Sequence, residues 1–189
     1  MNHINMGKGY LELIFGPMFS GKTTTLIQKY KQHKLLGHDI IVINYFQDTR
    51  YAEQGLYSHD GLNIDCIQAE TLEQVIEHNE KRIDNCSVII INEGQFFSDI
   101  FEKVIHWVEQ KEKIVYVCGL DSDFKRKKFG NFLELIPFCD NITKLKSLCM
   151  KCKNGTRALF SKRITNDESQ IVIGSDNYIP VCRNCYLAN

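Results

Sequence analysis

Eight residues near the start of the chain have the spacing of a phosphate-binding loop. The segment Gly16-Pro17-Met18-Phe19-Ser20-Gly21-Lys22-Thr23 matches G-x-x-x-x-G-K-[ST] at every fixed position. Glycines let successive backbone N–H groups point into one concavity, and a helix that follows adds the partial positive charge of its N-terminus. Lys22 can then reach the β- and γ-phosphates of a nucleotide, and the Thr23 hydroxyl can ligate Mg²⁺. The alternative is a glycine-rich turn without function.

Two C-x-x-C pairs lie near the end of the chain, Cys149 with Cys152 and Cys182 with Cys185. Each pair can place two thiolates on one metal ion, so the two pairs together predict a tetrahedral zinc site. Four thiolates leave no open position for a substrate, and we therefore expect the zinc to be structural. The alternatives are a redox-active pair or unrelated core cysteines. The remaining cysteines are expected to be reduced core residues: Cys66, Cys86, Cys118 and Cys139.

An acidic residue follows the apolar run that ends at Ile91-Asn92-Glu93. Proteins with a phosphate loop often place an acid at the end of such a strand, where it holds Mg²⁺. Glu93 could hold the metal through water, or act as the general base on an attacking hydroxyl. A solvated carboxylate in a turn is the alternative.

The stretch between the cysteine pairs contains Ser161-Lys162-Arg163, then Ile171-Val172-Ile173-Gly174-Ser175, then Tyr178. Branched apolar residues followed by glycine and serine predict a short strand that ends in exposed backbone. Because metal would anchor this loop at both ends, it could close over a small ligand.

Apolar runs and helical periodicity alternate along the first three quarters of the chain. The predicted strands are 11–15, 39–44, 62–67, 87–91 and 113–118, and the predicted helices are 24–36, 71–80 and 98–110. Thr71 with Gln74 has the pattern of a capping box, and Ser98 is the expected cap of the third helix. Alternation of this kind predicts an α/β fold with a parallel sheet, in which ligands bind at the carboxyl ends of the strands.

The whole chain has 189 residues, with 23 basic and 23 acidic side chains and a formal net charge of +0. This length allows one domain with a small appendage, and we place the boundary between 1–143, the nucleotide-binding part, and 144–189, the zinc part. A balanced charge argues against a general nucleic-acid or membrane-surface binder. The sequence has neither a signal-peptide pattern nor a run long enough to span a bilayer, so we expect a soluble, cytoplasmic protein.

Further motifs join these in a fixed order along the chain. They are Asp48-Thr49-Arg50-Tyr51, Ser58-His59-Asp60, Glu93-Gly94-Gln95-Phe96-Phe97, Gly119-Leu120-Asp121 and Asp123-Phe124-x-Arg126-x-x-Phe129-Gly130. Together with the phosphate loop and the cysteine pairs, this set resembles the type II thymidine kinase family, which includes cellular cytosolic and poxvirus enzymes. The resemblance extends from about Leu11 to Tyr186.

The resemblance implies a phosphate-loop kinase fold with a zinc-ribbon appendage, and ATP- and Mg²⁺-dependent phosphorylation of the 5′-hydroxyl of thymidine and deoxyuridine. It implies that Glu93 is the general base, that Arg50 lies near the phosphates with Arg163 as a helper, and that a lasso loop before Tyr178 grips the thymine through backbone hydrogen bonds. The implied walls of the base site are Met18, Phe96, Leu120, Phe124, Phe129 and Tyr178, and the implied lasso residues are Ile171, Val172, Ile173 and Gly174. The family is homotetrameric and is inhibited by thymidine triphosphate.

The sequence departs from the family pattern at two places. The family has Asp before the catalytic Glu, where this chain has Asn92. An asparagine keeps an oxygen ligand but lacks the charge, which predicts weaker or water-mediated contact with Mg²⁺. The lasso, Gly174-Ser175-Asp176-Asn177-Tyr178, is one residue shorter than the family's. Two other functions fit some of the motifs: a phosphate-loop ATPase whose zinc ribbon touches nucleic acid, and a regulatory protein that binds nucleotide with weak activity.

Overall fold

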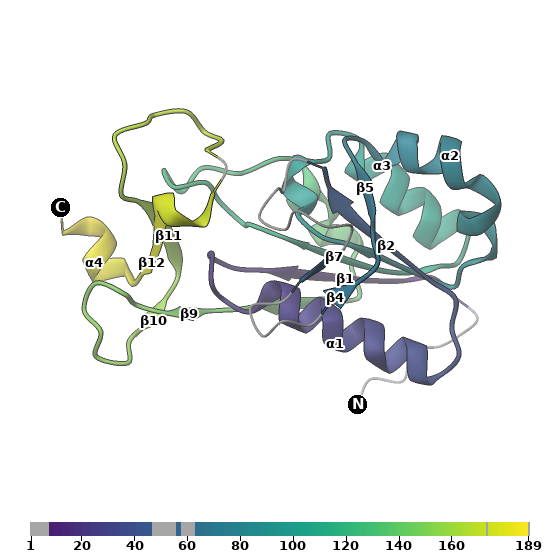
Figure 1. Ribbon diagram of the computed structural model, residues 1–189, viewed down its shortest axis with the longest axis horizontal. Helices are drawn as coiled ribbons and strands as arrows, with labels where there is room; N and C mark the ends of the chain where they lie inside the picture. Colours follow the sequence, from purple (N-terminus) through teal and green to yellow (C-terminus); the bar gives the residue numbers. More distant parts are fainter. Residues whose placement is uncertain (1–7, 47–55, 58–62, 173, 189) are drawn as a thin grey trace.

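Six parallel strands form the central sheet, in the order β5-β2-β6-β7-β1-β8 (Figure 1). The computed structural model describes residues 8–46, 56–57, 63–172 and 174–188. The strands of this sheet are β1 (Tyr10–Phe15), β2 (Ile40–Tyr45), β5 (Ile67–Ala69), β6 (Val88–Ile91), β7 (Ile114–Gly119) and β8 (Asn141–Lys144). Strands β1, β2, β6 and β7 confirm four of the predicted strands to within one or two residues, because each has a nearly continuous apolar run.

The predicted strand 62–67 is only partly correct. Its residues divide between β4 (Asn63–Ile64), which pairs antiparallel with β3 (Leu56–Tyr57), and β5, which joins the central sheet. The polar residue Asp65 lies between β4 and β5, so the apolar residues on either side belong to two different sheets. Strand β8 was missed, because its alternating sequence lacks the apolar run of a central strand and lies at the edge of the sheet, against β1 alone.

Helices cover both faces of the sheet (Figure 1). They are α1 (Lys22–Leu35), α2 (Leu72–Asn85), the 3₁₀ turn η1 (Gly94–Phe96), α3 (Ile100–Ile105), the π-helical turn η2 (His106–Gln110) and the 3₁₀ segment η3 (Phe132–Phe138). Leu26 and Ile27 of α1 pack on one face against side chains such as Ile90. The other face carries α2, α3, η2 and η3. The structure therefore confirms a layered α/β fold. None of the described helices is long and apolar enough to cross a bilayer.

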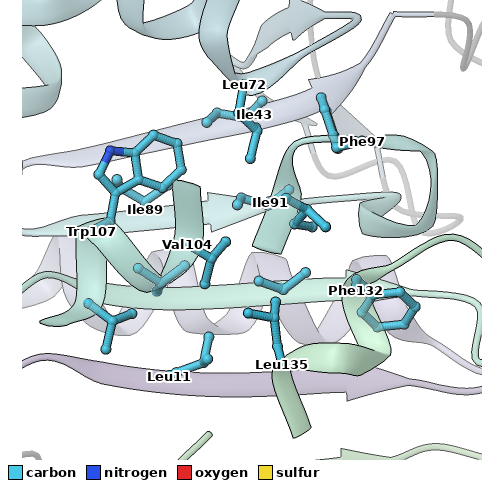
Figure 2. Packing of buried hydrophobic residues seen from close by; sticks show 14 of the residues in the cluster. Leu11, Ile43, Leu72, Ile89, Ile91, Phe97, Val104, Trp107, Phe132 and Leu135 are labelled. Carbon is cyan, nitrogen blue, oxygen red and sulfur yellow. The ribbon is translucent and has the colours of Figure 1, made fainter. Parts of the chain in front are cut away.

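The larger apolar cluster lies between the sheet and α2, α3, η2 and η3 (Figure 2). Figure 2 shows Ile89 and Ile91 of β6 beneath Leu72, with Trp107 and Phe132 closing the two ends. Alternate residues of each buried strand face this cluster, and the intervening ones face α1. A sheet buried on both faces holds its strand ends in fixed positions.

The start of α2 is stabilised by two side chains. The Thr71 hydroxyl accepts a hydrogen bond from the Gln74 amide at 3.3 Å, which confirms the predicted cap. The carboxylate of Asp99 accepts hydrogen bonds from the amides of Leu72 and Glu73, at 3.1 and 2.9 Å. Ser98 was the wrong cap for the next helix, because α3 begins at Ile100 with Asp99 in the N-cap position. Asp99 thus joins the starts of two helices, a tertiary role that local spacing does not reveal.

The chain beyond β8 forms a separate small unit at one end of the sheet (Figure 1). Its elements are β9 (Ser147–Leu148), β10 (Arg157–Ala158), β11 (Phe160–Arg163), the 3₁₀ turn η4 (Ser175–Asn177), β12 (Tyr178–Val181) and α4 (Arg183–Leu187). Strands β9 and β10 pair antiparallel, as do β11 and β12. Strand β8 belongs to the central sheet and ends at Lys144. The division into 1–143 and 144–189 remains a prediction.

A buried histidine lies where α1 packs on the sheet. The ring of His33 makes two hydrogen bonds, one between Nε2 and the Tyr116 hydroxyl at 2.9 Å and one between Nδ1 and His38 Nδ1 at 2.8 Å. Burial is the main cause that lowers the pKa of His33 to about 4, and the nearby charges of His38 and Lys29 contribute to the same shift. The folded protein therefore keeps this ring neutral at a pH where the unfolded chain protonates it.

We expect the stability of the protein to fall as the pH drops from about 6.5 toward 4, because only the unfolded chain takes up the proton on His33 in this range. The loss due to His33 is about 1.4 kcal/mol at pH 5.5 and about 3 kcal/mol in total. Urea unfolding of the wild type and of His33→Gln between pH 7.5 and 5 measures it as the difference between the two curves. Titrations shared by both proteins cancel in this difference, and the exposed His78→Gln serves as the control. Parallel curves for wild type and His33→Gln would contradict the expectation.

Candidate active site and zinc centre

The phosphate-loop residues 16–23 connect the end of β1 to the start of α1, as the motif requires. Gly16 lies against the chain that follows β8, and a Cβ atom built on it would meet the Leu145 carbonyl oxygen at 2.5 Å. Gly21 precedes α1 with a φ of 84°, in the left-handed region that favours glycine. Glycine is therefore required at position 16 by the close approach of another backbone segment, and favoured at position 21 by the backbone conformation.

The donors of this loop suit an anionic ligand. Lys22 and Thr23 are the first residues of α1, so both lie at the positive end of the helix dipole. The Lys22 ammonium donates a hydrogen bond to the Pro17 carbonyl at 2.9 Å, which holds it over the loop. The Ser20 hydroxyl is buried without a hydrogen-bond partner among the described residues. A buried hydroxyl of this kind and a lysine at a helix N-terminus match the oxygen atoms of a phosphate.

Glu93 lies at the same edge of the sheet as the phosphate loop. Strands β6 and β1 flank β7 in parallel, so the residues after β6 and β1 emerge about 10 Å apart. Cys118 of β7 lies between the two groups. The pKa of its thiol is raised to about 12, mainly by burial; the Lys22 charge opposes this shift and the Glu93 charge adds to it. The charges of Lys22 and Glu93 therefore both act on the Cys118 thiol.

The backbone of Glu93 is held in an unusual conformation. Its φ is 55°, in the left-handed region that costs a non-glycine residue about 1–2 kcal/mol. The side chain is only 7% exposed, and its Oε2 accepts a hydrogen bond from Gln95 Nε2 at 2.6 Å. A carboxylate fixed this way points in one direction, which a solvated turn carboxylate would not do.

Asn92 is engaged by the neighbouring strand. Its Nδ2 donates to the Asn44 side-chain oxygen at 2.8 Å, and both residues are 2% exposed. The Asn44 Nδ2 in turn donates to Gln68 Oε1 at 3.2 Å. A chain of amides thus crosses the ends of β6, β2 and β5. Since one side of the Asn92 amide binds Asn44, its own Oδ1 is the atom that could approach a hydrated cation.

Aromatic side chains gather next to Glu93. Phe96 stacks on Tyr45 with ring centroids 4.8 Å apart, and meets the edge of Phe129 at 5.3 Å. The Leu120 amide donates to Gln95 Oε1 at 3.0 Å, so the loop that follows β7 is attached to the turn after β6. The structure therefore brings Phe96, Leu120 and Phe129 together near Glu93. Their role as walls of a base site remains a prediction.

Arg163 of β11 binds the loop that precedes β12, residues 164–177, which we call the lasso from here on. Its guanidinium donates to the carbonyl oxygens of Asp167 at 2.8 Å and of Gln170 at 3.2 Å. It also donates to the carbonyl oxygen of Ser169 and to the hydroxyl of Tyr178. The Tyr178 hydroxyl also lies 3.3 Å from the carbonyl oxygen of Val172. This arginine is therefore occupied by the lasso itself, and the described contacts include none with the phosphate loop.

The lasso and the C-terminal unit are attached to the loop 119–130. The Arg163 guanidinium lies 3.8 Å from the centre of the Phe124 ring, and the Tyr186 hydroxyl donates to the Phe124 carbonyl at 2.7 Å. Gln170 Nε2 donates to the carboxylate of Asp123 at 2.9 Å. The C-terminal unit therefore contacts the loop that carries part of the predicted base site.

A second contact links the C-terminal unit to the phosphate loop. The Met18 amide donates to the Ser161 hydroxyl at 2.9 Å, across 143 positions of sequence. Ser161 and Arg163 are alternate residues of β11, and both are buried. One strand therefore contacts the phosphate loop with one side chain and the lasso with the next. The phosphate loop and the lasso are therefore both contacted by side chains on the same face of β11.

Some predicted site residues are placed differently or lie outside the described part. Ile171 and Val172 are not in a strand: the predicted strand here is wrong, and the lasso backbone is held by Arg163 and Tyr178 in place of strand pairing. Gly174 has a φ of 119°, immediately before η4. Arg50 and Ile173 lie outside the described residues, as do Asp48, Thr49 and Tyr51 and the motif Ser58-His59-Asp60.

Several residues that shape this site were not predicted from the sequence. They are Asn44, Gln95, Asp123, Ser161 and Gln170. Gln95 stood within a quoted motif, and Ser161 stands two residues before Arg163, so the spacing offered a signal for both. Asp123 also stood within a quoted motif. Asn44 and Gln170 make contacts with distant segments, and no local pattern marks these two residues.

The four paired cysteines converge in the C-terminal unit. Every Sγ atom lies within 4.8 Å of the others, and this is the one such cluster among the described residues. Tetrahedral zinc–sulfur bonds of about 2.3 Å place sulfur atoms about 3.8 Å apart, which this arrangement fits. Burial opposes the Cys149 thiolate, but amides of Cys152, Cys182 and Lys151 outweigh it and lower the pKa of the thiol to about 6. The pKa of Cys185 is raised, first by a hydrogen bond with Cys182 that favours its protonated thiol, and also by the charge of Cys149. Four packed thiolates would repel one another unless a cation joined them.

The remaining cysteines lie apart from this cluster. Cys86 and Cys118 are buried and reduced, while Cys66 and Cys139 are reduced and half-buried. The prediction of reduced core residues is thus confirmed in full for the first two.

The sequence was compared with protein families and with individual known proteins. The family model described as "Thymidine kinase" matches residues 9–186. The thymidine kinase of vaccinia virus, strain Ankara, is 42% identical over 185 residues, which are 97% of this chain and 100% of that protein. The thymidine kinase of variola virus is 42% identical over 183 residues, 96% of this chain and 99% of that protein. The sheeppox virus thymidine kinase is 40% identical over 182 residues, 96% and 98% of the two chains. The chain therefore belongs to the thymidine kinase family.

Proposed function

We propose that the protein transfers the γ-phosphoryl group of ATP to the 5′-hydroxyl of thymidine, giving thymidine monophosphate in cytoplasmic nucleotide salvage, and that it accepts deoxyuridine as well. The observation that supports this most is the position of Glu93 beside the phosphate loop, at one edge of a rigid parallel sheet. Phosphoryl transfer requires positioning and charge neutralisation more than covalent help from the protein. A lysine at a helix N-terminus and a directed carboxylate supply these two requirements.

In this proposal each part of the site has one task. Residues 16–23 and Arg50 bind the phosphates of ATP, with Lys22 neutralising the transferred group. Mg²⁺ supplies positive charge between the phosphates when bound, and the Thr23 hydroxyl and Asn92, through water, would hold it. Glu93 takes the proton from the 5′-hydroxyl as that oxygen attacks. The lasso and the C-terminal unit exclude water, which would otherwise compete for the phosphoryl group.

The thymine is proposed to bind between the loop 119–130 and the lasso. The residues assigned to it are Met18, Phe96, Leu120, Phe124, Phe129, Arg163, Ile171, Val172, Ile173, Gly174 and Tyr178. Arg163 acts by holding the lasso carbonyls and Tyr178, as its contacts support. Backbone groups that hydrogen-bond the base reject other bases strongly, because the mismatched buried groups stay unpaired. Thymidine triphosphate would fill the base site and the phosphate loop together, which explains its proposed role as an inhibitor of a homotetramer.

A panel of radiolabelled nucleosides with ATP and Mg²⁺ tests this function. We expect thymidine and deoxyuridine to give monophosphate products, and deoxycytidine and purine nucleosides to give far less. The same assay includes single-stranded and duplex DNA without nucleoside. ATP turnover that DNA stimulates and thymidine does not would overturn the proposal in favour of a nucleic-acid-dependent ATPase. Nucleotide binding without any nucleoside phosphate would favour a regulatory protein.

We expect Asn92→Asp to lower the Mg²⁺ concentration needed for the half-maximal rate by about fivefold, the effect of roughly 1 kcal/mol from one added charge. Magnesium titrations at saturating ATP and thymidine measure it. The Asn44 amide must turn over to donate to the new carboxylate, so a melting curve accompanies the titration. Asn85→Asp is the matched control, because this exposed residue precedes the opposite end of β6. An unchanged Mg²⁺ requirement in Asn92→Asp would remove Asn92 from the metal site.

A further inference from the structure

Gln95 lies between Glu93 and the loop that follows β7, and it is 3% exposed. Both ends of its side-chain amide are used. Nε2 donates to Glu93 Oε2 at 2.6 Å, and Oε1 accepts a hydrogen bond from the Leu120 amide at 3.0 Å. Hydrogen bonds to ionised groups are shorter and stronger than neutral ones, and 2.6 Å is at the short end of their range.

The surroundings of Gln95 fix which way its amide points. The Leu120 N–H can only donate, so the oxygen of Gln95 must face it, and the nitrogen must then face Glu93. Two glycines approach Gln95 closely, one at its side chain and one at its backbone. A Cβ atom on Gly119 would meet Gln95 Oε1 at 2.5 Å, and one on Gly130, whose φ is 63°, would meet the Gln95 carbonyl oxygen at 2.0 Å.

We infer that Gln95 is the positioning residue for Glu93, and that it sets the direction of the carboxylate relative to the loop 119–130. The inference rests on the proposed role of Glu93 as general base. Glu93 is in a left-handed backbone conformation, so the backbone alone does not give its side chain a usual direction. Gln95 supplies that direction by joining the carboxylate to the Leu120 backbone. A base that must meet a hydroxyl within hydrogen-bond distance depends on such a constraint.

The experiment replaces Gln95 by methionine, which has a similar length but neither donor nor acceptor. We expect kcat to fall by about 10- to 100-fold, because a small misplacement of a reacting group has effects of this size. We expect the KM for thymidine and for ATP to stay near the wild-type values, since the Gln95 side chain contacts Glu93, the proposed general base, and neither substrate. Gln74→Met is the control: this glutamine also accepts a hydrogen bond from a backbone amide, that of Glu70 at 3.1 Å, but lies on α2.

A double variant separates positioning from a merely structural effect. If Gln95 acts through Glu93, then Gln95→Met should have no further effect on kcat in a Glu93→Gln background. Losses that multiply, or a wild-type kcat in Gln95→Met alone, overturn the inference while the proposed function stands. A Glu93→Gln variant with wild-type kcat overturns the assigned base and this inference together.

Gln95→Glu decides the matter if the methionine variant does not fold. It has nearly the same shape and keeps an acceptor for the Leu120 amide, so the attachment of the loop remains. It replaces the donor to Glu93 by a second carboxyl group, which repels the first. We expect a loss of kcat of at least 10-fold, by the same effect of misplacement. A wild-type kcat in Gln95→Glu overturns the inference.

Discussion

Replacing Glu93 by glutamine is expected to lower kcat for thymidine phosphorylation by about 10²- to 10⁴-fold, the contribution typical of a general base. The substitution keeps the shape of the side chain and an oxygen that can accept the hydrogen bond from Gln95 Nε2. What it removes is the ability to take a proton from the 5′-hydroxyl. The binding of both substrates should change little, so the loss should appear in kcat more than in KM.

Steady-state rates over a range of thymidine and ATP concentrations measure this effect. Glu12→Gln is the matched control, since Glu12 is also a buried glutamate, 2% exposed, but faces α1 and pairs with Lys29 at 2.7 Å. That variant should lose stability and keep kcat. A Glu93→Gln protein that melts like the wild type and retains its turnover would remove Glu93 from the chemistry.

Removing zinc should have the second large effect. The C-terminal unit has a very small apolar core, formed by Cys149, Ala158, Val181 and Cys182, with other residues packed against it. Zinc binding contributes about 10–16 kcal/mol in small sites of this kind, which exceeds what such a core supplies. Cys182→Ser should therefore unfold residues beyond β8 and abolish thymidine phosphorylation, while the central sheet stays folded.

Three measurements check the zinc prediction. Elemental analysis should find one zinc ion per chain in the wild type. Hydrogen exchange should show lost amide protection in β11 and β12 of Cys182→Ser, with protection kept in β6 and β7. ATP binding should weaken and persist, because the phosphate loop stays joined to β1 and α1 while it loses the Met18 contact with Ser161 and the close approach of Gly16 to the chain after β8. Cys139→Ser is the control, since this cysteine is outside the cluster. A metal-free wild type with full protection in β11 would contradict the prediction.

The central strands could be predicted because one physical demand acts on each of them. A strand buried on both faces needs apolar residues at nearly every position, and the runs 88–91 and 114–118 satisfy this without reference to any other segment. The phosphate loop is equally local, since its glycines and its lysine are read along eight positions. The cluster of four cysteines could be predicted for the same reason, as the members of each pair are close in sequence.

The contacts that complete the site could not be predicted, because they depend on the packing of distant segments. Nothing local indicates that Ser161 meets Met18, or that Asp99 begins α3 while its carboxylate binds α2. The branched run 171–173 was predicted as a strand, yet Ile171 and Val172 lie outside any strand. The Val172 carbonyl accepts a hydrogen bond from the Tyr178 hydroxyl, and Arg163 binds carbonyl groups just before the run, at 167 and 170. Propensity is outweighed where one buried cation offers several donors to the backbone.

Strand β11 has a consequence for how relatives of this chain can differ in length. Its side chains at positions 161 and 163 face the same way because the strand repeats every two residues. Deleting or inserting a single position between them would turn one of the two outward and break its contact. The stretch 164–177 has no such periodicity to preserve. Gaps among homologues should accordingly cluster in that stretch, while β11 keeps a constant length.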